Sequence, residues 1–174
     1  MLLGMFLNNL TFTNELIKVR NGSSARVITA PNGTPMIELA DPNGNRISVN
    51  DFDRLSVDEK NLILNNISSK EGIGYRSELG GIIAPNENYT GNPARAILLR
   101  VHKDPSVING FIEAASTGKV DMFLSNPNGI YLNGGLVGRF GNVTFTKRHV
   151  TEYFFKLAAK HPIIDIRDDF NGHT

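Results

Sequence analysis

The sequence predicts an all-β protein built from many short strands. The first observation is a Pro-Asn unit that recurs along the chain, at residues 30–33, 41–44, 84–87 and 126–129. Proline fixes φ at the first corner of a tight turn, and asparagine and glycine accept the positive φ that later corners need. The second observation is that the apolar runs between these corners are short. Each unit therefore reads as a sharp bend between two strands.

The predicted strands follow one another with little room for helices. Most of them are bounded by Asn, Gly or Pro, as short strands are. In chain order they cover residues 25–29, 36–39, 46–49, 62–64, 81–83, 94–101, 111–114, 120–124, 130–132 and 143–146.

The pattern alone leaves two architectures open. The runs around Val27, Ile37 and Ile47 recur at equal steps, which a sandwich of short hairpins would also give. The many asparagines favour a parallel β-helix, because side-chain amides at corners can stack from coil to coil and bond to one another and to the backbone.

Composition excludes several functions. The 174 residues suit one domain, and a net charge of +1 gives no basic surplus for binding nucleic acid. The absence of cysteine excludes disulfides, thiolate nucleophiles and cysteine metal sites. Residues 1–10 are apolar but too short to span a bilayer, and they read as a signal-sequence remnant or a first strand.

No group of residues points to catalysis or metal binding. The histidines, at 102, 149, 161 and 173, are scattered, without a pair at i and i+4. Asp165, Asp168 and Asp169 form the nearest carboxylate cluster, in the C-terminal tail. We therefore expect no catalytic residues, no metal and no cofactor.

Eight segments, in order, resemble the secretion domain of two-partner secretion exoproteins, the haemagglutination-activity domain of filamentous haemagglutinin-like proteins. Residues 126–130 read Asn-Pro-Asn-Gly-Ile, as the family's NPNGI motif does, and Asn133-Gly134-Gly135 follows as in the family. Residues 30–35 are similar to its opening APNGxP segment. The other matching segments are 42–50, 50–57, 61–66, 78–83, 94–101 and 108–113.

The resemblance implies a right-handed parallel β-helix, a pectin-lyase-like solenoid with N-terminal capping strands. The spacing of apolar residues in the tail adds a short C-terminal helix to this expectation. It divides the chain into residues 1–24, an N-terminal strand, cap or signal remnant; 25–146, the β-helix domain; and 147–174, a divergent tail.

The resemblance also implies a function. The domain is a secretion signal that passes through the periplasm unfolded, is recognised by periplasmic polypeptide-binding domains of an outer-membrane transporter, and folds outside the cell. The protein is then secreted or on the cell surface, with host glycans or receptors as further partners. A free-standing carbohydrate-binding or adhesive β-helix is the alternative.

The resemblance also assigns residues to two roles. Recognition by the transporter falls on Asn126, Pro127, Asn128, Gly129, Ile130, Pro85 and Asn86. Structural corners fall on Pro31, Asn32, Gly33, Pro42, Asn43, Gly44, Asn65, Asn66, Gly80, Gly81, Asn133 and Gly134. For Asn126 and Asn128, a plain turn role is an equally open interpretation.

The sequence departs from the family in several places. Leu55 and Ser56 stand where the family has Phe and Asn. Arg46 and Asn61 stand where the family has glycine. Ala84-Pro85-Asn86-Glu87 stands where it has NPNL. After Thr146 the resemblance stops, and residues 151–161 have helical spacing, with Val150, Phe154, Leu157 and Ala158 on one face. We expect this segment, residues 150–160, to cap the open end of the solenoid. A mobile tail without a capping role is an equally open interpretation.

Overall fold

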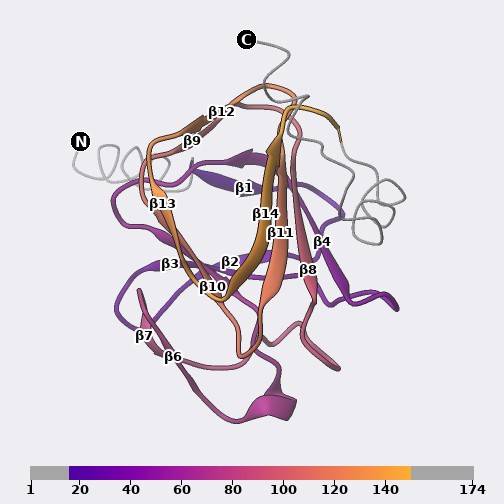
Figure 1. Cartoon of the computed structure of the whole chain (residues 1–174), viewed down its shortest axis with the longest axis vertical. Coiled ribbons are helices and arrows are strands. Elements are labelled where there is room, and N and C mark those ends of the chain that lie inside the picture. The colour runs from indigo at the N-terminus through magenta and orange to yellow at the C-terminus, as the bar shows by residue number, and fades with distance from the viewer. Residues whose placement is uncertain (1–15, 150–174) are drawn as a thin grey trace, which may run out of the picture.

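The structure is a computed structural model that describes residues 16–149. Within them almost every regular element is a strand, and Figure 1 looks along the stack of strands. The elements are β1 (Ile17–Val19), β2 (Arg26–Thr29), β3 (Pro35–Glu38), β4 (Ile47–Leu55), β5 (Leu62–Asn65), the 3-10 turn η1 (Ser69–Glu71), β6 (Tyr75–Ser77), β7 (Gly81–Ile83), β8 (Ala96–Val101), β9 (Ser106–Ile108), β10 (Phe111–Ala115), β11 (Val120–Ser125), β12 (Ile130–Leu132), β13 (Gly135–Gly138) and β14 (Phe140–Thr146).

The strands form a single stacked spiral with three sides. One side is the sheet β1-β4-β8-β11-β14, and the second is the sheet β13-β10-β5-β3-β2. On the third side β9 pairs with β12, and Val57 forms an isolated parallel bridge to Ile108. Residue 106 lies beside residue 130, so one coil takes 24 residues. This arrangement confirms the parallel β-helix and excludes a sandwich of hairpins.

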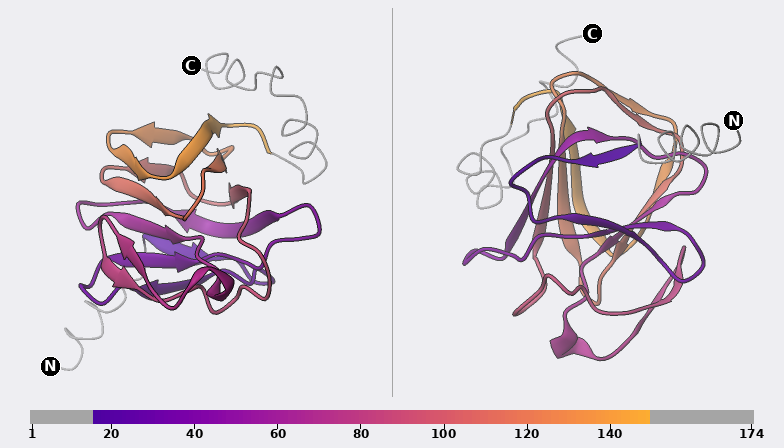
Figure 2. Two further views of the ribbon diagram at one scale, coloured as in Figure 1. Left: turned by 60° about the horizontal axis from the view of Figure 1, so that its bottom comes forward. Right: turned by 180° about the vertical axis from the view of Figure 1, so that it is seen from behind.

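Two antiparallel strands cover the N-terminal end of the spiral. β1 runs antiparallel to β4, and β2 forms a hairpin with β3, which itself lies parallel to β5. The predicted capping strands are therefore present. Figure 2 shows the coils rising from this end, in indigo, to the last described strand, β14, in yellow.

One insertion interrupts the coils. Between β5 and β8 the chain leaves the spiral, forms η1, and returns through the antiparallel hairpin β6–β7. In Figure 1 this hairpin lies at the bottom, outside the three-sided stack.

The interior is a column of stacked aliphatic side chains. In β8, Ile97 and Leu99 face the core, and Met122 and Leu124 of β11 lie beside them in register. Burial of such side chains contributes about 25 cal/mol per Å² of apolar surface removed from water, so stacking of coils is the main stabilising term. The fully buried polar residues Ser48 and Asn50 lie in the same register as Ile97 and Leu99.

The predicted strands match the observed ones where apolar runs are flanked by turn residues. The runs at 81–83 and 130–132 agree with β7 and β12 residue for residue. β4 is longer than predicted, because its outward carboxylates, such as Asp51, are paired across strands with Arg100. No run was predicted for β1, β6, β9 or β13, which have only three or four residues each and depend on neighbouring strands.

Two expectations fall outside the described residues. The signal remnant or first strand at residues 1–10 lies there, as does the capping segment at 150–160. The described part of the predicted N-terminal region, residues 16–24, contains the cap strand β1.

Candidate recognition corner

The Asn-Pro-Asn-Gly corner connects β11 to β12, and its first asparagine is fully buried. Asn126 Oδ1 accepts a hydrogen bond from the Asn128 amide at 2.9 Å, and the Asn126 carbonyl accepts from the Gly129 amide at 3.1 Å. Gly129 has a φ of 118°, a conformation that side chains rarely adopt. The motif therefore specifies an Asx turn whose side chain points inward.

Asn126 joins three consecutive coils. Its amide Nδ2 donates to the Asp104 carbonyl at 2.8 Å and to Ser106 Oγ at 2.9 Å, both on the preceding coil. Its backbone N–H donates to the carbonyl of Thr146, on the following coil, at 2.9 Å. Removing this buried amide would leave its partners without hydrogen bonds and lower the free energy of unfolding, so Asn126 has a structural role.

The other residues of the corner divide by exposure. Gly129 and Ile130 are buried, and Ile130 packs in the core cluster. Pro127 and Asn128 are exposed. Of the five residues that the family motif assigns to recognition, only these two are on the surface of the folded domain.

Asn86 is also buried, under the insertion. Its Nδ2 donates to the carbonyls of Leu39 at 3.0 Å and Asn65 at 2.9 Å, and its Oδ1 accepts from the Asn88 amide at 2.8 Å. The turn itself runs from Asn86 to Tyr89, whose amide donates to the Asn86 carbonyl. Pro85 is half-buried. The structure therefore gives Asn86 the same kind of inward role as Asn126.

Asn65 and Asn66 hold the start of the insertion. Asn65 Nδ2 donates to Glu38 Oε2 at 3.1 Å and to the Ala84 carbonyl at 3.0 Å. Asn66 Nδ2 donates to the Ala94 carbonyl at 2.9 Å, and its Oδ1 accepts from the Tyr89 hydroxyl at 2.7 Å. Burial raises the pKa of Tyr89, so this hydroxyl keeps its proton.

The β2–β3 hairpin turn is the predicted Pro31-Asn32-Gly33 corner. The Gly33 amide donates to the Ala30 carbonyl at 2.8 Å, and Gly33 has a φ of 93°. Asn32 Nδ2 reaches the Leu79 carbonyl at 2.8 Å. Near this contact a Cβ on Gly80 would lie 2.9 Å from the Ala30 Cβ and 2.5 Å from Ile63 Cδ1, so a side chain there would force its buried neighbours to shift.

The second predicted corner is displaced. Its hydrogen-bonded turn runs from Asn43 to Arg46, whose amide donates to the Asn43 carbonyl at 2.8 Å. Pro42 precedes this turn and Gly44 is its second residue. Arg46 takes the positive φ, 61°. The prediction of a corner at 41–44 was therefore two residues early, because Asn43 Oδ1 accepts from the amides of Asn45 and Ile47 and starts the turn.

Asn133 and Gly134 lie in a stacked column at another corner. Asn133 Nδ2 donates to Asn109 Oδ1, one coil earlier, at 3.1 Å. A Cβ on Gly134 would lie 1.8 Å from the Gly110 carbonyl oxygen. The column confirms that corner amides pair from coil to coil, as the asparagine content suggested.

Sequence reasoning missed the buried carboxylate of Glu113. Its Oε1 accepts from Ser77 Oγ at 2.7 Å and from the Leu79 amide at 2.9 Å. Its Oε2 accepts from the Glu78 amide at 3.0 Å. Glu113 on β10 thus fastens the β6–β7 hairpin to the spiral. The available signal was an acidic residue inside the apolar run 111–115.

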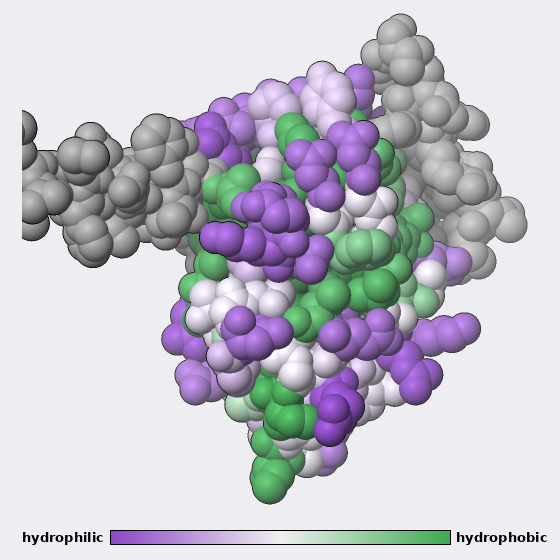
Figure 3. Space-filling view, turned by 90° about the vertical axis from the view of Figure 1, so that its left-hand side faces the viewer, coloured by the Kyte–Doolittle hydropathy of each residue, from purple (hydrophilic) through white to green (hydrophobic). Residues whose placement is uncertain are grey.

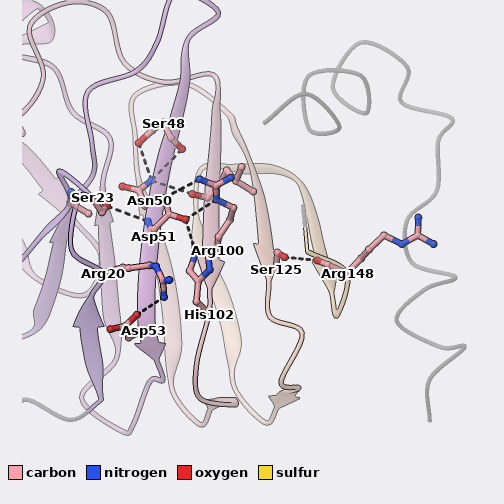
Figure 4. A network of polar contacts seen from close by, with 12 residues as sticks. Arg20, Ser23, Ser48, Asn50, Asp51, Asp53, Arg100, His102, Ser125 and Arg148 are labelled. Atoms are coloured by element: carbon pink, nitrogen blue, oxygen red, sulfur yellow. Dashed lines mark hydrogen bonds and ion pairs between the residues drawn. The ribbon is translucent and has the colours of Figure 1, made fainter. Parts of the chain in front are cut away.

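A second missed feature is a network of charges on the outer side of the first sheet, drawn in Figure 4. Asp51 accepts from Arg100 Nε at 2.7 Å and Nη2 at 2.9 Å, and His102 Nε2 lies 2.8 Å from Asp51 Oδ1. Burial alone would raise the pKa of Asp51, but the hydrogen bonds from Arg100 and His102 outweigh it and hold that pKa below its ordinary value. The network joins the first coil to the second.

Within residues 16–149 no three His, Asp or Glu side chains lie close enough together to hold a metal ion. In the same residues no helix is long and apolar enough to span a membrane.

The family model of the TPS secretion domain matches residues 15–137. The chain belongs to this family. The matched range contains the buried-asparagine corners, the Glu113 contact and the whole Asn-Pro-Asn-Gly-Ile motif. Exoproteins of this family are secreted or displayed on the cell surface after crossing the periplasm, and this chain is a secretion domain of that kind.

Three relatives illustrate the match. The chain is 34% identical to filamentous hemagglutinin of Bordetella pertussis over 70% of its length, 34% identical to tRNA nuclease CdiA of Yersinia mollaretii over 75%, and 32% identical to hemolysin of Serratia marcescens over 68%. It spans only 3%, 4% and 7% of those proteins, respectively.

A solved structure supports the fold. The chain matches the crystal structure of the filamentous hemagglutinin secretion domain with a TM-score of 0.66 and 28% identity. The match covers 79% of this chain and 44% of that chain.

Proposed function

We propose that periplasmic polypeptide-binding domains of an outer-membrane two-partner secretion transporter recognise this domain through the Asn126–Ile130 corner. The observation that carries the proposal is the division within the motif. The Asn126 side chain is buried and bonds to the preceding coil, whereas Pro127 and Asn128 are exposed on the surface. Packing of the core therefore does not explain the identity of these two residues. A motif that only formed a turn would need Asn126 and Gly129 but not an exposed asparagine at 128.

The same motif then has two roles at two stages of export. In the unfolded chain all five residues are accessible to a transporter. Once the coil closes, Asn126 is withdrawn into its hydrogen bonds with Asp104 and Ser106. Folding would thus remove part of the recognised segment and favour release outside the cell.

Two substitutions separate these roles. We expect Asn128→Ala to leave the free energy of unfolding nearly unchanged and to weaken binding to the purified periplasmic domains of the cognate transporter. Asn126→Ala should lower the free energy of unfolding by about 3 kcal/mol, because it leaves buried groups on the preceding coil without partners.

Asn45→Ala is the matched control, since Asn45 is an exposed asparagine at a different corner. Unfolding in urea and binding by calorimetry measure the two properties. If the Asn128→Ala variant binds the transporter domains as tightly as the wild type, the motif acts only as a turn and the recognition proposal is wrong.

The absence of catalysis is a further part of the proposal. It is supported by the description of the matching family as a secretion domain. Names such as tRNA nuclease describe relatives of which this chain spans 4%. Binding of host glycans or receptors, and the lack of nucleic-acid binding, stay predictions.

A further inference from the structure

An asparagine followed by a glycine is a chemically labile step, and it recurs along this chain. The glycine has no side chain to shield its amide nitrogen, and its backbone is flexible. That nitrogen can attack the side-chain carbonyl carbon of the asparagine, which is one of the residues that heat damages. Within residues 16–149 the steps are 21–22, 32–33, 43–44, 109–110, 128–129 and 133–134.

Two of these steps are protected because the glycine amide closes a turn. The Gly33 amide donates to the Ala30 carbonyl at 2.8 Å, and the Gly129 amide donates to the Asn126 carbonyl at 3.1 Å. In both turns the asparagine is the third residue and the glycine is the fourth. The nitrogen that would attack is already bonded, so the reaction requires the turn to open first.

Three further steps are protected because the asparagine side chain is held. Asn43 Oδ1 accepts from the amides of Asn45 at 2.9 Å and Ile47 at 3.1 Å. Asn109 and Asn133 bond to each other at 3.1 Å. Asn133 directly precedes β13, on the side that Figure 3 turns toward the viewer, where hydrophilic residues lie at the surface among hydrophobic ones. These side chains must give up their bonds before the carbonyl carbon can reach the glycine nitrogen.

The step from Asn21 to Gly22 has neither protection. It lies between β1 and β2 in a turn whose closing bond runs from the Ser23 amide to the Arg20 carbonyl at 3.1 Å. The asparagine is the second residue of this turn, so the Gly22 amide does not close it. Both residues are exposed, and no residue in the range 16–149 bonds to the Asn21 side chain or to the Gly22 amide.

This turn is nevertheless well formed. The Arg20 amide donates to the Asp51 carbonyl at 3.0 Å, and Ser23 Oγ accepts from the Asp51 amide at 3.2 Å. Figure 4 shows Ser23 bonded to Asp51, and Arg20 bonded to Asp53 further along β4. The labile step is therefore accessible in the native fold, and its reaction does not require the turn to open.

We propose that Asn21 is the site at which the folded domain deamidates. The Gly22 nitrogen forms a bond to Asn21 Cγ, ammonia leaves, and the resulting succinimide takes up water to give aspartate or isoaspartate. Water is the only co-reactant. The product adds a negative charge next to Arg20, whose guanidinium pairs with Asp53 at 2.9 Å.

This inference does not depend on the recognition proposal, but the same geometry bears on the recognition corner. Asn128 is exposed, and its step is protected only by the bond from the Gly129 amide to the Asn126 carbonyl. That bond exists once the coil has closed. Folding would thus preserve Asn128, whereas the unfolded chain leaves it as labile as Asn21.

Peptide mapping by mass spectrometry tests the proposal in the full chain. The protein is incubated in warm, mildly alkaline buffer, with and without urea, and deamidation is followed at each step. Asn128 is the matched internal control, since it is also an exposed asparagine before a glycine in a turn. In the native protein we expect Asn21 to deamidate at least about tenfold faster than Asn128, because Asn128 reacts only through local opening. In urea the two rates should converge.

Two results would overturn the inference. Equal rates at Asn21 and Asn128 in the native protein would show that the turn gives no protection. A ratio that persists in urea would show that local sequence, and not the fold, sets the rates. As a second readout, Asn21→Gln should remove most of the isoaspartate that a methyltransferase detects in peptides from residues 16–149, and an unchanged amount would contradict the assignment.

Discussion

At the scale of single residues, the two residues that replace the family's glycines, Arg46 and Asn61, share an unusual backbone conformation. Among residues 16–149, Arg46 and Asn61 are the non-glycine residues with positive φ, at 61° and 69°. Glycine accepts this conformation without steric cost, asparagine accepts it at a small cost, and arginine at a larger one. The side chains offset this cost through hydrogen bonds to the next coil, from Arg46 to the Pro93 carbonyl and from the Phe111 amide to Asn61 Oδ1.

A comparison of two substitutions at Arg46 isolates the strain. Both Arg46→Gly and Arg46→Ala remove the bond to Pro93, but only the glycine relieves the left-handed backbone. We therefore expect the glycine variant to be more stable than the alanine variant by about 1 kcal/mol. Chemical denaturation measures the difference. The reverse order would show that Arg46 relaxes to a negative φ when its side chain is removed.

At the scale of elements, a single buried carboxylate makes several of the bonds that attach the β6–β7 hairpin to the spiral. Glu113 accepts three hydrogen bonds from this hairpin and its turn, and it is fully buried. Glu113→Gln replaces one acceptor oxygen by an NH₂ group that faces backbone N–H donors. The expected loss is about 2 kcal/mol in the free energy of unfolding.

The loss should be accompanied by faster hydrogen exchange at the hairpin amides, because the hairpin would open without the coils. Glu78→Gln, at an exposed position in the same turn, is the control. Exchange that accelerates equally in β8 and β11 would mean that Glu113 supports the whole spiral and not the hairpin alone.

The same elements show what the sequence could predict. Apolar runs between turn residues gave most strands, and the family motifs gave the spiral with its cap. The inward direction of Asn126 was not predictable, because an Asn-Pro-Asn unit is compatible with either asparagine in the Asx turn. That of Asn86 was not predictable because its turn begins at Asn86 itself, two residues after the start of the predicted unit at 84–87. β9 and β13 were missed because a three- or four-residue strand next to glycine is stabilised by the coils above and below it, which local sequence does not report.

At the scale of the whole molecule, the spiral is a chain of nearest-neighbour contacts, so its stability is close to a sum over coil interfaces. The interface of the first and second coils contains the charged network around Asp51 in addition to its aliphatic core. The free energy that these charged groups contribute to folding depends on pH, whereas that of the aliphatic core does not. The acid stability of the domain should therefore depend on this interface.

The direction of that dependence follows from the pKa of Asp51. The folded domain holds this pKa below the ordinary value of 3.8, so folding favours the charged form. The stabilisation is complete above the unfolded pKa and is lost as pH falls through the folded one. We expect Asp51→Asn to lower the free energy of unfolding by about 1–2 kcal/mol at pH 7, since hydrogen bonds to a charged group are weakened.

The difference between Asp51→Asn and the unsubstituted domain should shrink below pH 3.8, where the carboxyl of the folded domain also becomes neutral. Urea denaturation at several pH values measures it, with Glu59→Gln, at an exposed position, as the control. A difference that stays constant down to acid pH would mean that Asp51 contributes through its shape and hydrogen-bonding pattern rather than its charge. The coil interface would then lack the electrostatic component that its geometry implies.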